Sequence, residues 1–288
     1  MPAMLLLQGG GPTDRDGNQA PRIQSSLMKA LADALAARNI VSLRFDKRGM
    51  HANATTLPAS EAQWSAFFRW ESFVGDAVAA YRLLRATPGV DISRIGMIGH
   101  SEGGLIALTA AQLLASDRPP ASTLVLIATP GRPVQSVMRE QLALALLDMK
   151  LSPEESETLA SASNDIMQAI RETGTVPAAI PTRLVNLYPR YLGPFLRSLL
   201  AIDPAAFAWS FDGPVLVVNG SEDRQVSATR DADALQMALA ARPGASHAVM
   251  IAPDAAHDLT RRGASQPDAA TIAAIVEWIS RTPGTVPR

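Results

Sequence analysis

The chain has 288 residues, of which 47% are hydrophobic and 18% charged, which is the balance of a folded globular protein and not of a disordered one. Its formal net charge is -1 and it has no run of Lys or Arg, so the sequence excludes an electrostatic surface for nucleic acid or for an anionic membrane. Cysteine is absent, which excludes disulfides, thiolate catalysis and cysteine metal sites. With no basic leader segment and no apolar run near the roughly 20 residues of a membrane-spanning helix, we expect a soluble, cytoplasmic protein.

Short apolar runs alternate with helical stretches along most of the chain. The apolar runs predict buried strands at residues 4–8, 41–45, 94–99, 123–128, 214–219 and 248–252. The helical stretches predict helices at residues 22–38, 71–86, 102–115, 228–241 and 268–281. Continuous apolar strands separated by helices require a sheet that is covered on both faces. We therefore predict an α/β fold with a doubly wound, mostly parallel sheet, in which ligands bind at the carboxyl ends of the strands.

The interval between the fourth and fifth predicted strands is far longer than an ordinary connection. It is helical, with Ser152 as an N-cap, Pro153 at the first helical position and Glu155 placed to complete a capping box. The interval leaves from the carboxyl end of one strand and returns to the sheet. We therefore predict that residues 130–211 form a helical cap over the site, with some of its apolar side chains in an acyl pocket. The remaining residues, 1–129 and 212–288, form the core, with a frayed end at 283–288.

The segment Gly99-His100-Ser101-Glu102-Gly103 lies between a predicted strand and a predicted helix. A serine flanked at two positions by glycine on such a turn is typical of a nucleophile elbow. The serine backbone must be strained to hold its hydroxyl clear of the sheet, and a side chain at 99 or 103 would collide with neighbouring backbone. The alternative is a turn serine between two incidental glycines, but the flanking strand and helix favour the elbow. We predict that Ser101 is a nucleophile.

A serine hydroxyl needs a base to take its proton, and four histidines are available. His100 neighbours the serine and its side chain is expected to point away, whereas His247 precedes the last predicted strand and so lies at the wrong edge of the sheet. His51 follows the second predicted strand at the correct edge and is a candidate for lining the site. His257 lies just past the carboxyl end of the last strand. We predict that His257 is the base, the alternative being a solvated loop histidine.

The base in turn needs an acid that fixes its tautomer. Asp223 follows the fifth predicted strand at the carboxyl edge, whereas Asp212 precedes that strand. Glu222 is a rival in the same loop, and Asp254 and Asp258 are weaker rivals. Asp223 is preferred because its shorter side chain is the more rigid orienting group, although loop aspartates are more often turn residues. The predicted catalytic residues follow the chain in the order Ser101, Asp223, His257.

Three consecutive glycines, residues 9–11, follow the first predicted strand. Because glycine lets the backbone approach a bound acyl group closely, we predict an oxyanion hole formed by the amides of Gly10 and Glu102, the latter at a helix N-terminus. Gly11 and His51 are the predicted substrate contacts. A phosphate-binding loop is the rival interpretation, but no Gly-Lys-Ser/Thr and no Gly-x-Gly-x-x-Gly follows. The charged residues of the segment 13–18 are expected to brace the loop through mutual pairs.

With these motifs, the chain resembles the α/β-hydrolase superfamily, whose triads follow the same serine–acid–histidine order. More narrowly, it is similar to bacterial serine esterases and acyl hydrolases. In these the first loop carries Gly-Pro-x-Asp-Arg-Asp, here residues 11–16, and the next strand ends in Asp-x-Arg-Gly, here residues 46–49. The resemblance implies hydrolysis of a small-molecule carboxylic ester with no metal and no organic cofactor. The family loop usually begins with histidine, where this chain has Gln8.

The resemblance also implies that the usual first two strands are missing, because the chain starts on what would be the third. Either the protein is a shortened form or its true start lies upstream. An exposed sheet edge follows, which a homodimer would cover.

We expect a serine hydrolase that cleaves short to medium acyl or aryl esters through an acyl-enzyme intermediate. A thioesterase, an amidase or a peptidase would use identical residues, and a transferase on the same fold would favour another acceptor over water. The alternative from a different class is a protein that binds a ligand on this fold without turnover.

Overall fold

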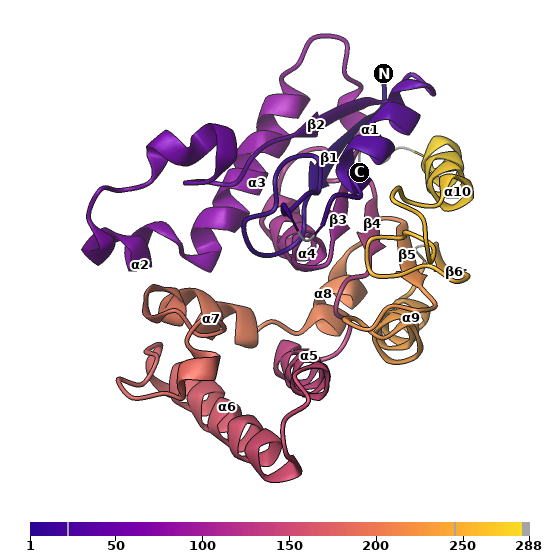
Figure 1. Cartoon of the computed structure of the whole chain (residues 1–288). Helices are drawn as coiled ribbons and strands as arrows, with labels where there is room; N and C mark the ends of the chain where they lie inside the picture. The colour runs from indigo at the N-terminus through magenta and orange to yellow at the C-terminus, as the bar shows by residue number, and fades with distance from the viewer. Residues whose placement is uncertain (22, 245, 284–288) are drawn as a thin grey trace.

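The computed structural model describes residues 1–21, 23–244 and 246–283. Six parallel strands form one sheet in the order β2-β1-β3-β4-β5-β6 (Figure 1). The strands are β1 (Ala3–Leu7), β2 (Val41–Arg44), β3 (Ile95–His100), β4 (Leu124–Ile127), β5 (Val215–Gly220) and β6 (His247–Ala252). The ends of every predicted strand are correct to within one residue. The prediction of an α/β fold with a parallel sheet is confirmed.

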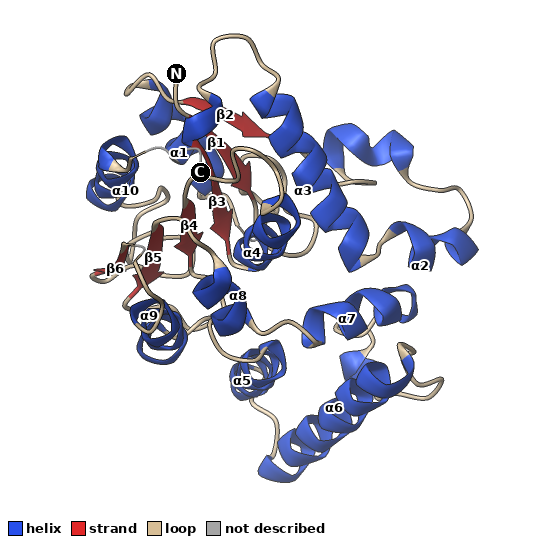
Figure 2. Ribbon diagram, turned by 180° about the vertical axis from the view of Figure 1, so that it is seen from behind, coloured by secondary structure: helices blue, strands red, loops and turns tan. Residues whose placement is uncertain are grey.

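The alternation of side chains along the strands divides the core between the two faces of the sheet. In β1, Leu5 and Leu7 belong to one apolar cluster, and Met4 and Leu6 to the other. The Met4 face packs against α1 (Leu27–Ala36) and α10 (Ala269–Arg281). The Leu5 face packs against α3 (Trp70–Arg85), α4 (Glu102–Leu114) and α9 (Asp233–Ala240) (Figure 2). Both faces of the sheet are therefore covered, which explains why its central strands are continuously apolar.

The first helix begins later than predicted. α1 starts at Leu27, and the predicted start at residue 22 lies outside the described residues. Ser26 has a φ of 53°, a left-handed conformation through which a right-handed helix does not continue. Before it, Ile23 pairs with Gln19 in a short antiparallel bridge and lines a cavity together with Ser101. The apolar Ile23 thus marks a loop that packs at the site and not a helical turn.

The other predicted helices differ from the structure mainly at their ends. The predicted helix 228–241 is a π-helical turn (Ala228–Ala232) that continues into α9. A short 3₁₀ turn, Ile92–Arg94, leads into β3. The frayed end predicted for 283–288 lies outside the described residues beyond residue 283.

The long interval between β4 and β5 is helical. It contains α5 (Val134–Asp148), α6 (Pro153–Thr173), the 3₁₀ turns Thr182–Leu184 and Arg190–Leu192, α7 (Gly193–Leu200) and α8 (Pro204–Ser210). The capping box predicted at the start of α6 is present, because Ser152 and Glu155 exchange side chain–backbone hydrogen bonds. In Figure 1, α5, α6 and α7 lie beyond the carboxyl ends of the strands, whereas α8 packs against α4 and α9 beside the sheet.

A buried ion pair anchors the start of this interval to the core. Asp231, at the π-helical turn, is fully buried and accepts hydrogen bonds from the backbone N–H groups of Gly131 and Arg132. The Arg132 guanidinium also binds Asp231 and, through both of its terminal nitrogens, Glu140 of α5. These contacts raise the pKa of Arg132, with the hydrogen bonds to Glu140 as the largest cause. These contacts therefore fix the backbone at residues 131–132 and the start of α5 relative to the core.

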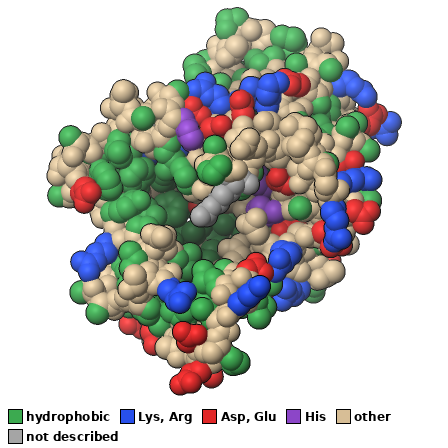
Figure 3. Space-filling model, in the orientation of Figure 1, with side chains coloured by type: hydrophobic (Ala, Val, Ile, Leu, Met, Phe, Trp, Pro, Cys, Tyr) green, Lys and Arg blue, Asp and Glu red, His purple; other side chains and the backbone are tan. Residues whose placement is uncertain are grey.

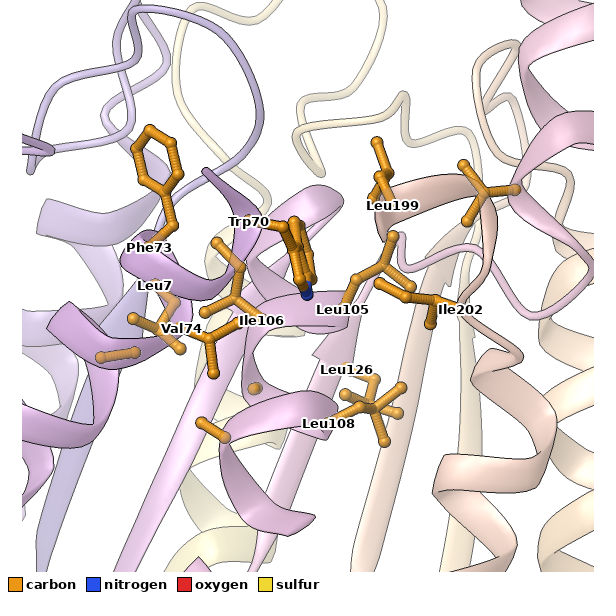
Figure 4. Packing of buried hydrophobic residues seen from close by; sticks show 14 of the residues in the cluster. Leu7, Trp70, Phe73, Val74, Leu105, Ile106, Leu108, Leu126, Leu199 and Ile202 are labelled. Carbon is orange, nitrogen blue, oxygen red and sulfur yellow. The ribbon is translucent and has the colours of Figure 1, made fainter. Parts of the chain in front are cut away.

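A second helical segment, between β2 and α3, was not predicted. It comprises the 3₁₀ turns His51–Thr56 and Glu61–Gln63 and the single turn α2 (Trp64–Phe67). Trp64 and Phe68 contact the ring of Tyr191, at centroid distances of 5.3 and 5.6 Å, which joins this segment to the interval before α7. Figure 4 shows part of the hydrophobic core, in which Trp70 of α3, Leu105 of α4 and Leu199 of α7 belong to one buried cluster. Over the described residues, no helix combines the length and the apolar character needed to cross a membrane.

Candidate active site

Ser101 lies on the tight turn between β3 and α4. Its φ and ψ are 54° and -121°, a conformation that strains any residue other than glycine. The glycines on either side make the turn possible. A Cβ on Gly99 would overlap the carbonyl oxygen of Gly103, and a Cβ on Gly103 would overlap the carbonyl oxygen of Leu7. Ser101 therefore occupies a strained strand-to-helix turn of the kind the glycine spacing predicts.

Asp223 and His257 follow neighbouring strands, β5 and β6, and their side chains meet at the carboxyl edge of the sheet. The His257 Nδ1 lies 2.8 Å from Oδ2 of Asp223, whose carboxylate is fully buried. The other carboxylate oxygen accepts hydrogen bonds from the backbone N–H groups of Gln225 and Val226 at 2.8 and 3.0 Å. Because a carboxylate only accepts, Nδ1 carries the hydrogen, and Nε2 of the neutral ring keeps its lone pair. Asp223 thus orients the imidazole of His257.

Ser101 and His257 line the same cavity, which has a volume of about 400 Å³. Its size lies within the range of small-molecule sites, about 300 to 1,000 Å³. Among the hydrogen bonds of the described residues, none joins the side chain of Ser101 to that of His257. The structure brings the serine and the histidine–aspartate pair to one cavity.

His100 lies closer to the site than predicted. Instead of pointing away, its side chain lines the cavity, and Nε2 donates a hydrogen bond to the backbone oxygen of His257 at 2.9 Å. Its ring lies 4.8 Å from the ring of His257, centroid to centroid. Burial lowers the pKa of His100 to about 4, and the neighbouring His257 adds to the shift. The reason for the wrong prediction is that the loop after β6 folds back over the end of β3, so the side chain of His100 meets it.

The glycine loop after β1 lies against the elbow. Gly9 and Gly10 line the cavity together with Ser101 and Glu102. A Cβ on Gly10 would lie 3.1 Å from Oε2 of Glu102, so the Glu102 side chain lies close to the glycine backbone, and the two residues predicted for the oxyanion hole are neighbours. The Thr13 hydroxyl donates to the carbonyl oxygen of Gly10 at 2.7 Å and closes the loop.

Gly11 and His51, the predicted substrate contacts, are not among the described residues that line the cavity. Gly11 is exposed, with a φ of 69°. His51 is also exposed, and its Nε2 donates to the carbonyl oxygen of Pro12 at 2.8 Å. Gly11 therefore lies on the outer surface of the glycine loop, and His51, in the turn after β2, packs against that outer surface through Pro12.

Within the glycine loop, Asp14 accepts hydrogen bonds from the backbone N–H groups of Asp16 and Asn18. The ion pairs of the loop are made with β2 and the chain after it. Arg15 binds Asp46 through its guanidinium at 2.6 and 3.1 Å, and Asp16 binds Arg44 at 2.7 Å. Burial alone would raise the pKa of Asp46, but the hydrogen bonds from Arg15 outweigh it and hold the pKa below its usual value. The loop is therefore braced from within by Asp14, but the ion pairs are not the mutual ones predicted, because the parallel neighbours β1 and β2 carry both loops to the same edge.

Sequence reasoning missed Lys47, which lies beside the glycine loop and contacts Glu102. The available signal was its position, two residues after the second predicted strand, at the carboxyl edge of the sheet where the site was expected. It also missed Gln19, Gln141 and Gln225, which supply polar groups to the cavity wall.

The helical interval forms much of the apolar wall of the cavity. Val134, Val137 and Met138 of α5 and Leu199 of α7 line it, as does Leu105 of α4. Figure 3 shows a hollow on this face of the molecule with hydrophobic side chains gathered in it. The cavity therefore combines an apolar wall with polar groups at the elbow.

The model of a protein family described as serine aminopeptidase, S33, matches residues 24–261 of the chain. The chain belongs to this family. Within the curated proteins, this S33 chain is 28% identical over 228 residues to the esterase EstD of Thermotoga maritima. The match covers 78% of the chain and 47% of EstD, so the chain spans about half the length of that relative.

Solved structures similar to this S33 chain include Est1E from Butyrivibrio proteoclasticus with bound ferulic acid. Its TM-score is 0.59 at 17% identity, over 98% of this chain and 89% of Est1E. A malate-bound thermophilic esterase from Thermogutta terrifontis has a TM-score of 0.55 at 18% identity, over 98% and 90% of the two chains. A puromycin-hydrolysing peptidase from Mycobacterium tuberculosis has a TM-score of 0.55 at 18% identity, over 100% of this chain and 35% of the peptidase. These similarities establish the α/β-hydrolase fold of the S33 chain.

Proposed function

We propose that the protein is a serine hydrolase that cleaves carboxylic esters through an acyl-enzyme, with Ser101 as nucleophile, His257 as base and Asp223 as orienting acid. One observation carries the proposal. A strained serine and a histidine hydrogen-bonded to a buried aspartate line a single cavity. Membership of the S33 family and the similarity to EstD support it.

In the proposed reaction, Nε2 of His257 takes the hydroxyl proton of Ser101 as its oxygen attacks the carbonyl carbon of the ester. The resulting oxyanion accepts hydrogen bonds from the amides of Gly10 and Glu102. His257 then gives the proton to the leaving alcohol, and the acyl group stays on Ser101. Water attacks the acyl-enzyme with the same base, which releases the acid and restores the serine.

We propose an acyl or aryl ester of short to medium length as substrate. The apolar side chains of α5 and α7 that line the cavity support this choice, because they remove an acyl chain from water. The helical interval at residues 130–211 would then act as the cap of the site, and its apolar wall would determine which acyl chain lengths the enzyme accepts.

The test is hydrolysis of a series of p-nitrophenyl esters of increasing acyl length by the native protein and by Ser101→Ala. We expect turnover by the native protein with an optimum at short to medium chains, and loss of that turnover in Ser101→Ala. Unchanged turnover in Ser101→Ala would contradict the proposal.

A second candidate, cleavage of amides, is favoured by the family description, serine aminopeptidase, and uses the same residues. Amino-acid p-nitroanilides and a thioester assayed beside the esters distinguish these activities by their kcat/KM. A protein that only binds its ligand would hydrolyse neither the esters, the p-nitroanilides nor the thioester, even if Ser101 can be labelled covalently.

A further inference from the structure

Lys47 is a buried cation between the glycine loop and the elbow. Its side chain is 6% exposed. Its Nζ donates hydrogen bonds to the carbonyl oxygens of Gly9 at 2.6 Å and Gly11 at 3.1 Å, and contacts Oε1 of Glu102 at 3.3 Å. A lysine that is buried to this degree needs such partners, because desolvation of an unpaired ammonium group is costly.

The bond to Gly9 acts on the peptide unit that carries the Gly10 amide. A peptide group is planar, so the Gly9 carbonyl and the Gly10 N–H belong to one rigid unit and point in opposite directions. The Lys47 ammonium holds the oxygen end of this unit, which fixes the direction of the N–H. A cation at the oxygen also polarises the unit and strengthens the N–H as a donor.

The contact between Lys47 and Glu102 offsets the negative charge of the Glu102 carboxylate beside the predicted oxyanion hole. The Glu102 carboxylate packs over Gly10, since Oε2 would lie 3.1 Å from a Cβ on that glycine. A carboxylate beside a developing oxyanion opposes it, and this opposition is stronger in a partly buried site than in bulk water. The ammonium of Lys47 lies on the other carboxylate oxygen and offsets that charge.

We propose that Lys47 is a positioning residue of the oxyanion hole, which aims the Gly10 amide and neutralises Glu102. This inference rests on the proposed function. The alternative is that Lys47 only holds the loop in place, as Arg242 does elsewhere. Arg242 is 7% exposed and donates to the backbone oxygens of Phe211, Gly213 and Ser246, all before β5 or β6 at the opposite edge of the sheet.

The experiment compares Lys47→Met, Glu102→Gln, the double variant and Arg242→Met as the matched control for loss of a buried cation. For each we would measure kcat, KM, the thermal midpoint and the Ki of an alkyl trifluoromethyl ketone. Addition of the Ser101 oxygen to this ketone gives a tetrahedral alkoxide, while the serine proton moves to His257, so its Ki reports on the oxyanion hole.

We expect Lys47→Met to lower kcat and raise the Ki by about 10- to 100-fold, below the loss for a complete oxyanion donor, with a much smaller change in KM. Compared with Lys47→Met, the double variant should have a kcat about tenfold higher and a Ki about tenfold lower, because the uncompensated carboxylate of Glu102 is then gone. Arg242→Met should lower the thermal midpoint and leave kcat and the Ki unchanged.

Equal kcat and Ki in Lys47→Met and the native protein would overturn the inference, as would a double variant no better than Lys47→Met. If Lys47→Met does not fold, Glu102→Gln alone decides: the charge argument requires a lower Ki, and an unchanged or higher Ki overturns it. Failure of the proposed function is distinct, because the native protein would then lack Ser101-dependent turnover.

Discussion

At the scale of single residues, the site depends on what each side chain is bonded to. Asp223 is fully buried, with one oxygen held by two backbone amides and the other by Nδ1 of His257. Its carboxylate therefore has no freedom to rotate, and the imidazole it holds has one tautomer. The neighbouring Glu222 is exposed.

Asp223→Asn should lower kcat by about 10³- to 10⁴-fold, because an amide no longer requires a hydrogen on Nδ1 and the wrong tautomer forms. Steady-state kinetics on the preferred ester would measure the loss. Glu222→Gln, the matched change one residue earlier, should retain the native kcat. A reversed result would transfer the role of the acid to Glu222.

Sequence could predict Ser101, Asp223 and His257 as candidates because chain position relative to a strand end restricts which residues reach one edge of a parallel sheet. It could not predict that His100 bonds to the backbone of His257, or that Lys47 bonds to the Gly9 carbonyl. Such contacts depend on how loops from different strands fold over one another, and no local spacing encodes that.

At the scale of elements, the elbow requires close approach of β1, β3 and α4. A Cβ on Gly103 would overlap the backbone of Leu7 and Gln8, so α4 can pack this close to β1 only with glycine at its start. Gly75 within α3 is different, because a Cβ there meets nothing within 4 Å.

Gly103→Ala should destabilise the fold by about 1 to 3 kcal/mol and reduce turnover, because α4 and Ser101 must move. Gly75→Ala should stabilise it by about 0.5 to 1 kcal/mol, since alanine is the better helix former. Urea unfolding of both variants measures the two effects. If the free energy of unfolding changed only slightly, and equally, in Gly103→Ala and Gly75→Ala, close packing of α4 on β1 would not be required.

Periodicity predicted the strands and most helices because apolar alternation reports burial directly. It failed at α1, where the left-handed Ser26 makes the helix begin at Leu27, and at the turns between β2 and α3. Those turns are stabilised by ring contacts with Tyr191, far away in sequence.

At the scale of the whole molecule, the half-buried His100 couples stability to pH. Its pKa is about 4 in the folded protein and about 6.5 in an unfolded chain. As pH falls from 6.5 to 4, the unfolded state binds a proton that the folded state does not. Stability from this group is therefore full above pH 6.5 and falls by up to about 1.4 kcal/mol per pH unit within that window.

His100→Gln keeps a hydrogen-bond donor at this place and removes the titration. We expect the free energy of unfolding, measured by urea at intervals from pH 7 to pH 4, to fall less steeply in His100→Gln than in the native protein. Parallel curves for the two proteins would show that His100 does not carry the effect.

The most direct test of the account is covalent labelling with a fluorophosphonate, followed by mass spectrometry of the peptides. The account predicts one label, on Ser101, formed at least about 100-fold more slowly in His257→Ala because the base is gone. A label on another residue, or equal labelling rates in the native protein and His257→Ala, would contradict it.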